Sequence, residues 1–242
     1  MDHLESNFAD RMTEMCGRFT LRTPLTQLAK QFQFDLDAAQ VQLPLRFNIA
    51  PTQDVAAVRL AGGKRELVQL RWGLIPSWAK DPKIGNTMIN ARAETVSVKP
   101  ALRAAFKRRR CLVLADGYYE WLREGKIKQP YLYEINAGQP FAMAGLWESW
   151  RGTAGPDSPP LESCTIITTE ANELARKNHD RMPVILHEAD YAAWLDPACA
   201  NVEYLLAPFE ADPMTARAVS THVNNARHEG PECIAPIEGC TS

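Results

Sequence analysis

The sequence predicts a single α+β domain, in which a mixed, mostly antiparallel β-sheet is curled or barrel-like and short helices lie at its periphery. Many short apolar runs are bounded by turn-forming residues, which is typical of β-strands. The 17 prolines among 242 residues favour fixed turns over long helices. An apolar content of 45% in a chain of this length is enough for one sizeable hydrophobic core.

The first half of the chain combines one clear helix with several strands. Thr23 and Pro24 predict a helix start, because a capping hydroxyl precedes a residue that needs no amide hydrogen. Apolar residues then follow at helical spacing as far as Phe32. The later elements of this half are an extended run broken by proline (46–52), a hairpin (55–60 and 66–72, turning at 61–64), a loop or strand exit (72–78), an irregular polar stretch (86–94) and a short helix (100–109).

The second half consists mainly of buried strands separated by turns. Asp116 and Gly117 form one turn, and residues 136–138 form another that continues a meander. Residues 151–160 form a loop that joins two strands and is too short to require a domain boundary. The predicted elements are strands (111–115, 118–122, 130–135, 141–147 and 163–168), short helices (170–177 and 188–195) and a late strand (215–220).

The composition excludes several functional classes. A formal net charge of −2 gives no overall attraction to nucleic acid, so any nucleic-acid surface must be a local patch. The longest apolar runs are too short to cross a bilayer, and we expect no membrane association. The six cysteines show no C-x-x-C pair and no metal-ligand spacing, and without an export signal they indicate reduced thiols. We expect a cytoplasmic monomer with no metal and no other cofactor.

Cys16 directly follows Met15, and this position gives it a special chemical possibility. If Met15 is an initiator that is trimmed, Cys16 carries an α-amine with a pKa of about 7.7–8.0 beside a thiol with a pKa of about 8.5. Such an aminothiol can attack an aldehyde through nitrogen and then close a five-membered thiazolidine ring through sulfur. The alternative is that Cys16 is a small buried hydrophobe, as most free cysteines are.

Three further residues are candidates for catalysis, each with a plainer alternative. Glu120 is flanked by Tyr119 and Trp121, so strand alternation places it on the opposite face from both; it is either a solvent-facing carboxylate or a proton shuttle with a raised pKa. His179 is a proton donor or an ordinary structural histidine. Asn90 either holds a terminal amine, because its amide both donates and accepts, or is a loop residue.

Nucleic-acid contacts are suggested by one basic run and several rigid side chains. The run 107–110 is the obvious basic patch, although cationic residues favour a helix C-terminus in any protein. Trp72, Trp78 and Pro51 can stack on or wedge against unpaired bases, and they can equally belong to the core.

Six separate stretches, in order, resemble one family, the SOS response-associated peptidase (SRAP) family of abasic-site-processing proteins. The matching stretches are Met15–Phe19 (MCGRF), Phe47–Pro51 (FNIAP), Trp72–Pro76 (WGLIP), Ile89–Thr95 (INARAET), Ala115–Trp121 (ADGYYEW) and His179–Pro183 (HDRMP). A weaker similarity lies at Val219, Ser220 and Asn224. The resemblance extends from Met15 to about Ile237.

The resemblance implies a chemistry and assigns residues to it. Proteins of this family crosslink to abasic sites in single-stranded DNA through an N-terminal cysteine, here Cys16, and the family's older proposed activity is self-cleavage before that cysteine. The resemblance makes Glu120 and His179 proton-transfer residues and gives Asn90 the task of orienting Cys16. The expected DNA contacts are Arg18, Pro51, Trp72, Arg92, Trp121, Thr168 and Ser220.

The resulting hypothesis is an abasic-site sensor and processing enzyme that would join the nucleoid at DNA damage. Residues 1–15 are expected to be a leader that is mis-assigned or removed, 16–237 the SRAP domain and 238–242 a flexible tail. Two alternatives stay open. One is a thiol peptidase that uses Cys16, His179 and Asn90, and the other is a non-catalytic module that binds single-stranded DNA.

Overall fold

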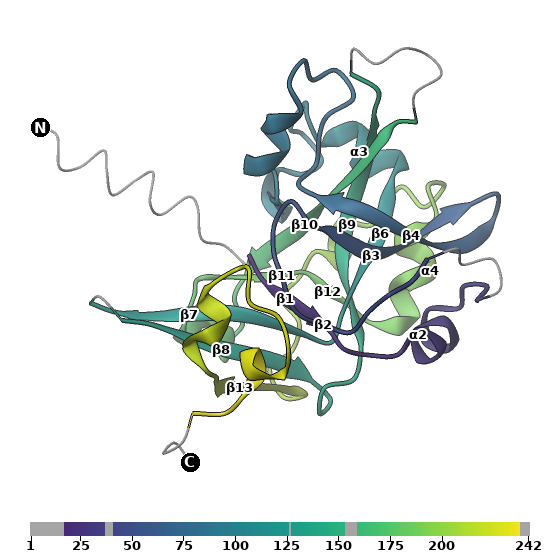
Figure 1. Ribbon diagram of the computed structural model, residues 1–242. Helices are drawn as coiled ribbons and strands as arrows, with labels where there is room; N and C mark the ends of the chain where they lie inside the picture. Colours follow the sequence, from purple (N-terminus) through teal and green to yellow (C-terminus); the bar gives the residue numbers. More distant parts are fainter. Residues whose placement is uncertain (1–16, 37–40, 126, 153–158, 238–242) are drawn as a thin grey trace, which may run out of the picture.

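The computed structural model describes residues 17–36, 41–125, 127–152 and 159–237, and it contains two β-sheets that share one core. Cys16, the expected leader and the expected tail lie outside these residues. The first sheet has five strands in the order β13-β8-β7-β1-β2, and the second has eight, in the order β11-β10-β4-β3-β6-β9-β12 with β5 beside β10 (Figure 1). Phe19 and Tyr118 of the first sheet belong to the same buried cluster as Val58 and Val113 of the second. The prediction of an α+β fold with a single core is confirmed.

The strands of the two sheets come from both halves of the chain. The five-stranded sheet consists of β1 (Phe19–Leu21), β2 (Arg46–Ile49), β7 (Gly117–Glu124), β8 (Ile127–Ile135) and β13 (Met214–Ala218). The eight-stranded sheet consists of β3 (Asp54–Ala61), β4 (Lys64–Trp72), β5 (Asn90–Arg92), β6 (Arg110–Ala115), β9 (Phe141–Trp150), β10 (Leu161–Glu170), β11 (Arg181–Pro183) and β12 (Ile185–Leu186).

The helices among the described residues are short. The α-helices are α2 (Leu25–Phe32), α3 (Arg103–Arg108) and α4 (Tyr191–Leu195). The short 3₁₀-helices are η1 (Pro82–Thr87), η2 (Ala93–Thr95), η3 (Ala175–Lys177), η4 (Glu188–Asp190), η5 (Glu203–Leu205), η6 (Thr221–Asn224) and η7 (Pro231–Ile234). Within the described ranges no helix is long and apolar enough to cross a membrane.

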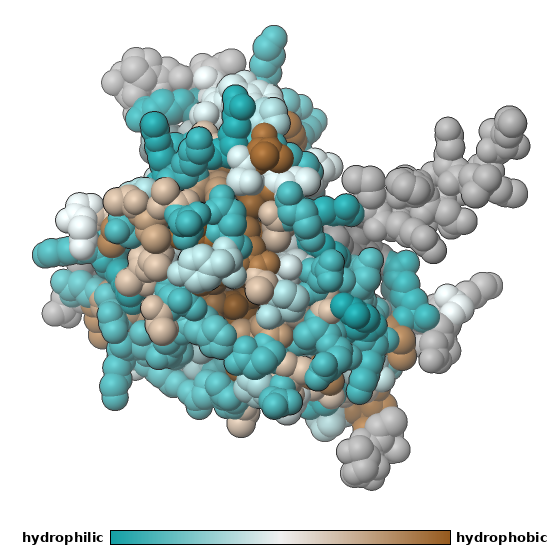
Figure 2. Space-filling model, turned by 180° about the vertical axis from the view of Figure 1, so that it is seen from behind, coloured by the Kyte–Doolittle hydropathy of each residue, from teal (hydrophilic) through white to brown (hydrophobic). Residues whose placement is uncertain are grey.

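The larger sheet closes on itself, because β10 pairs with β9 as well as with β4. The strands β10, β4, β3, β6 and β9 therefore form a ring, and the predicted curled, barrel-like sheet is confirmed. Every residue of β6 is buried, which is expected of a strand covered on both faces. Most strand pairings among the described residues are antiparallel, and β10 pairs in parallel with β4 and β5. On the reverse side, hydrophobic atoms show mainly in a central hollow between hydrophilic rims (Figure 2).

The prediction for the start of α2 is right in position and wrong in mechanism. Leu28 and Phe32 are buried as the helical spacing predicts, and Gln33 ends the helix in the left-handed conformation. Thr23, however, does not cap the helix, because its hydroxyl donates to Asp116 Oδ2 at 2.9 Å. The Thr23 hydroxyl therefore binds the carboxylate of Asp116, which is distant in sequence, and does not cap the helix as the local pattern predicted.

Two predicted turns lie where the chain crosses from one sheet to the other. The segment at Asp116 and Gly117 leads from β6 in the larger sheet to β7 in the smaller one. The expected meander through 136–138 is wrong, since β8 and β9 lie in different sheets. Alternating apolar residues are compatible with either sheet, so the pattern alone could not decide the partner of β9.

Two other local predictions are corrected by long-range pairing. The expected helix at 170–177 is limited to η3, because β10 continues to Glu170. The stretch 86–94, expected to be irregular, contains β5, which pairs in parallel with β10 through Asn90 and Ile166. Of the expected loop at 151–160, residues 153–158 lie outside the described part of the chain.

Candidate active site and nucleic-acid interface

Glu120 lies on the inner face of β7 and is almost fully buried. Its side chain is 1% exposed, so the solvent-facing alternative is wrong. Alternation along β7 is as predicted: Tyr119 and Trp121 face an outer apolar cluster, whereas Tyr118 belongs to the main core. A carboxylate therefore sits among core side chains, where burial is costly without a specific role or partner.

The first described strand runs alongside Glu120. β1 pairs with β7 through Phe19 and Tyr118, and the amide of Tyr119 donates to the carbonyl of Arg18 at 3.0 Å. The described chain begins at Gly17, one residue after Cys16. The backbone that leads to the predicted nucleophile is thus fixed to the strand that carries the predicted proton shuttle.

Arg18 is held in a fixed position by partners from both ends of the chain. Its Nη1 donates to Asn48 Oδ1 and to the carbonyl of Val223, each at 2.8 Å. The guanidinium lies 5.9 Å from the ring centroid of Trp121, whose Nε1 donates to Asn224 Oδ1 at 2.7 Å. Burial lowers the pKa of Arg18, although the guanidinium stays charged at neutral pH. Arg18 and Trp121 therefore form one preorganised edge of the site.

Trp72 connects β1 to Asn90 and does not face solvent. It is 0% exposed, its ring meets Phe19 edge-on at 5.1 Å, and its Nε1 donates to the carbonyl of Ile89 at 2.8 Å. The expectation that Trp72 touches DNA is corrected, and the core alternative holds. Pro51 lies half-buried nearby, since the next residue, Thr52, donates its amide to the Trp72 carbonyl at 2.8 Å.

His179 has one preferred neutral tautomer. Its Nδ1 accepts a hydrogen bond from the amide of Arg181 at 3.0 Å, so the proton of the neutral ring is on Nε2. Burial lowers the pKa of His179; the carboxylate of Asp180, 3.1 Å away, acts in the opposite direction but is 89% exposed. The positive charge of Arg123 on β7 also disfavours the imidazolium, which places His179 near the strand of Glu120. His179 can therefore donate from Nε2 as a neutral ring.

Arg181 ties several predicted residues together, and the sequence patterns did not single it out. Its guanidinium donates to both carboxylate oxygens of Glu94, just after β5, and to the carbonyl of Thr168 at 2.5 Å. This ion pair lowers the pKa of Glu94. Through its amide Arg181 also fixes His179. Arg181 and Glu94 both lie within matching stretches, which was the available signal.

Thr168 and Arg92 are neighbours across β10 and β5; Arg92 is open to a phosphate, whereas one can reach Thr168 only if the side chains that cover it move. They are register partners in the parallel pair, and Arg92 is exposed. Thr168 is fully buried, and its hydroxyl has no hydrogen-bond partner among the described residues. An unsatisfied buried hydroxyl is costly, at about 1–3 kcal/mol, and such a group commonly serves a ligand.

The remaining predicted contacts divide into internal and exposed groups. The Ser220 hydroxyl accepts from the amide of His222 at 3.2 Å and so caps η6, which gives it a structural task. The basic run also splits, because Arg110 is buried and donates to the carbonyls of Phe106 at 2.8 Å and Trp194 at 2.5 Å. Trp78, by contrast, is 62% exposed and is free to stack on a base.

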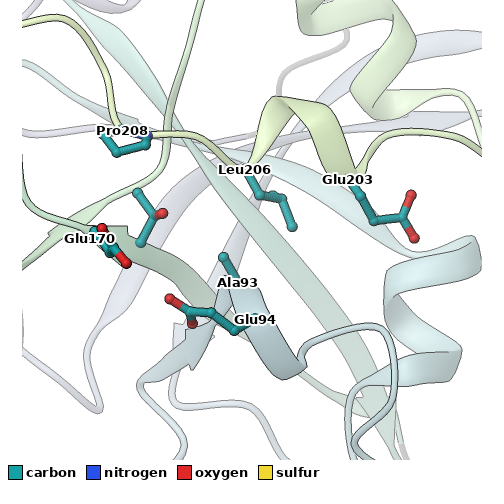
Figure 3. Close-up of a pocket in the computed structure, with 7 residues that line it drawn as sticks. Ala93, Glu94, Glu170, Glu203, Leu206 and Pro208 are labelled. Carbon is teal, nitrogen blue, oxygen red and sulfur yellow. The ribbon is translucent and has the colours of Figure 1, made fainter.

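A hollow of about 310 Å³ lies at the end of β10 (Figure 3). Thr169 and Glu170 line it, whereas Thr168 does not. Glu94, Glu170 and Glu203 supply carboxylates to its wall, which makes it a poor site for a phosphate backbone. Within the described residues, no group of three or more His, Cys, Asp or Glu side chains is placed to hold a metal ion.

These features define the class: a β-rich protein with a buried carboxylate (Glu120), a neutral histidine (His179) and two arginines held in place by hydrogen bonds (Arg18 and Arg181). Glu120 and Arg18 lie at the paired strands β7 and β1. The family model described as SOS response associated peptidase (SRAP) matches residues 15–226. The chain belongs to the SRAP family.

Relatives and solved structures agree with this assignment. The abasic site processing protein YoqW of Bacillus subtilis is 44% identical over 224 residues, which cover 91% of this chain and 99% of YoqW. The abasic site processing protein HMCES of Xenopus tropicalis is 37% identical over 72% of this chain and 58% of its own length. A crystal structure from Bordetella bronchiseptica has a TM-score of 0.73 at 27% identity, covering 85% of this chain and all of that one. One from Bacteroides thetaiotaomicron has a TM-score of 0.78 at 24% identity, covering 92% and 100%, and is similar in fold.

Proposed function

We propose that this protein processes abasic sites by forming a covalent thiazolidine link between an N-terminal Cys16 and the aldehyde of an abasic site in single-stranded DNA. The adduct would shield the lesion from strand cleavage. Relatives described as abasic site processing proteins support the lesion class. The chemistry requires that Cys16 be the first residue, through initiation at Met15 or through self-cleavage of residues 1–15.

The reaction is balanced without an oxidant or reductant. The α-amine of Cys16 adds to the aldehyde carbon of the open-chain sugar to give a carbinolamine, which loses one water to form an imine. The thiol then adds across the C=N bond, with sulfur bound to carbon and the proton transferred to nitrogen. The product is a five-membered ring, and the same steps in reverse release the DNA.

The described residues suit these steps. Neutral His179 would donate a hydrogen bond from Nε2 to the ring oxygen as the sugar ring opens, while Glu120 would shuttle protons during loss of water and, in reverse, during ring opening. Arg18, Arg92 and Thr168 would hold phosphates, and Trp78 would stack on a neighbouring base. Asn90, next to the Ile89 carbonyl that Trp72 binds, would orient the terminal amine.

The observation that carries the proposal is the position of Glu120. A carboxylate that is 1% exposed lies on the strand to which the backbone at Arg18, two residues after Cys16, is hydrogen-bonded. Burial disfavours the charged form of a carboxylate, so a carboxylate at this depth is suited to taking up and releasing a proton. A proton shuttle beside an amine that must lose and regain protons requires such a place.

The test is adduct formation by protein that begins at Cys16. It is incubated with single-stranded DNA that holds one abasic site and is run on a denaturing gel, with the intact mass of any product measured. We expect a heat-stable adduct whose mass equals protein plus DNA minus one water. Cys16→Ser should give a labile imine that survives only after borohydride reduction.

The matched control keeps residues 1–15 attached, so that the nitrogen of Cys16 is an amide. A durable adduct whose intact mass still includes residues 1–15, or one from Cys16→Ser without reduction, would contradict the ring chemistry. Intact DNA affinity without any adduct would indicate a binding module instead. Peptide cleavage that is lost in Cys16→Ala, again without an adduct, would indicate a thiol peptidase.

A further inference from the structure

Tyr133 is a buried side chain beside Glu120 that the proposed chemistry has not used. It lies on β8, where its register partner is Tyr118, and the two rings stack at 4.9 Å with an interplanar angle of 13°. Glu120 pairs with Tyr131 on the same two strands, so alternation places Glu120 and Tyr133 on one face. Tyr133 is 0% exposed, and its position is therefore fixed.

The hydroxyl of Tyr133 is the unusual part of this side chain. By strict distance and angle it has no hydrogen-bond partner among the described residues, but the side-chain amide of Asn178 is close enough to donate to it, and the charge of Glu120 acts on it. Phenylalanine would supply the same ring without a buried polar atom. The hydroxyl is thus kept beside an amide that can donate to it and a carboxylate that can accept its proton.

Asn178 adds a second observation that points to the same place. It directly precedes His179 and approaches Tyr133 from the segment between η3 and β11. The hydroxyl is thus close to Glu120 and to the residue that precedes His179. The other titratable groups around it are Tyr118 on β7, Tyr131 on β8, and Arg123, whose charge acts on His179.

We propose that Tyr133 is a positioning residue for Glu120: its hydroxyl donates to the Glu120 carboxylate during the reaction and keeps that carboxylate ionised and aimed at the proton it must accept. Burial, reinforced by the charge of Glu120, raises the pKa of Tyr133, so the phenol keeps its proton and acts as a donor. A hydrogen bond to the charged form of a carboxylate favours that form. This inference rests on the proposed function and names a residue that supports it.

The test compares Tyr133→Phe with Tyr191→Phe. Tyr191 is a matched control, since it is also a buried tyrosine and stacks on an aromatic ring, Phe32, at 5.5 Å. The rate of adduct formation is measured from pH 5 to 9 under single-turnover conditions. We expect Tyr133→Phe to react about tenfold more slowly at the acid end and to approach the parent rate at the alkaline end, equivalent to a shift of about one pH unit. Tyr191→Phe should follow the parent profile.

The same substitution is then made in Glu120→Gln. If Tyr133 acts through Glu120, Tyr133→Phe causes no further loss in that background. An equal loss in both backgrounds, or a Tyr133→Phe profile that matches the parent at every pH, would overturn the inference. Absence of any adduct from the parent overturns the proposed function as well, so the two failures are distinguishable. Thermal unfolding of each variant checks the fold, and Tyr133→Phe should melt no lower than the parent.

Discussion

Two buried polar regions of this protein differ in how completely their polar atoms are paired. At the end of the barrel, Arg110 donates to the carbonyls of Phe106, Trp194, Asp196 and Cys199 and joins α3 to α4. At the candidate site, the hydroxyls of Thr168 and Tyr133 have, by strict distance and angle, no hydrogen-bond partner among the described residues. The first region is organised for stability, whereas the second retains unsatisfied donors that a bound reactant can use. Substitutions should therefore affect stability in one region and reaction in the other.

The largest effect should come from Arg110→Met, which leaves several buried carbonyls without a donor. We expect the free energy of unfolding to fall by roughly 3–5 kcal/mol, from the cost of unsatisfied buried groups. Denaturant unfolding measures this change. The rate of adduct formation per folded molecule should be unchanged, and a selective loss of rate in a stable variant would remove the distinction between the two regions.

The complementary substitution is Glu120→Gln, which is nearly isosteric and removes the charge. General acid–base catalysis contributes typically about 10²–10⁴-fold, so we expect adduct formation and release to slow by at least about 100-fold. Because glutamine keeps the size of the side chain and an acceptor oxygen, the variant should still fold, which thermal unfolding checks. Release is followed with competing abasic DNA after the adduct has formed. A rate within twofold of the parent would exclude Glu120 as the shuttle.

Trp78→Ala tests the exposed part of the nucleic-acid interface. Stacking of a base on an aromatic side chain is worth about 1–3 kcal/mol, so affinity for single-stranded DNA should fall by roughly tenfold. Stability should not change, because the side chain is 62% exposed. Equilibrium binding to undamaged single strands measures the effect. Leu45→Ala is a useful control, as Leu45 is also exposed, at 52%, and has no aromatic ring.

Thr168→Val should change the stability of the fold and the affinity for DNA in opposite directions. Removing a buried hydroxyl that has no protein partner should stabilise the fold by about 1 kcal/mol. Loss of the proposed phosphate contact should weaken DNA binding a few-fold. Calorimetry and a binding titration on the same sample report both quantities, and lower stability together with unchanged affinity would argue against a phosphate contact.

The smallest effect concerns Glu94 and pH. Arg181 lowers the pKa of Glu94, so the pair contributes stability above the unfolded pKa of about 4.3 and loses it as pH falls through the lower folded value. Glu94 is 49% exposed, which limits the contribution to less than about 1 kcal/mol. Glu94→Gln should therefore lower stability slightly at pH 7 and not at pH 3. An equal deficit at both pH values would point to lost packing instead of charge.

The parts of this fold that depend on near neighbours could be predicted from the sequence. The spacing from Leu25 to Phe32 predicted α2, and the turn at 61–64 predicted the β3–β4 hairpin. In that hairpin Asp54 is paired with Arg71 at one end and Ala61 with Lys64 at the other. Alternation also placed Glu120 opposite Tyr119 and Trp121. It could not show that the face of Glu120 is covered, because the covering segments are distant in sequence.

The parts that depend on distant partners were missed for the same reason. β5 has only three residues and exists because β10 lies beside it in parallel. Trp72 has a sequence context equally suited to a loop and to the core, and only the packing of Phe19 and the Ile89 carbonyl decides between them. The role of Arg181 depends on Glu94, which is 87 residues away.

The bond between Arg18 and Val223 has a consequence for how the protein is made. Its two ends are 205 residues apart, so the carbonyl that fixes Arg18 is synthesised long after β1. Arg18 can therefore take its final position only late in synthesis, after most of the barrel strands have been made. Substitutions that disturb the segment around Val223 should impair the proposed chemistry near Arg18, even when the barrel itself has formed.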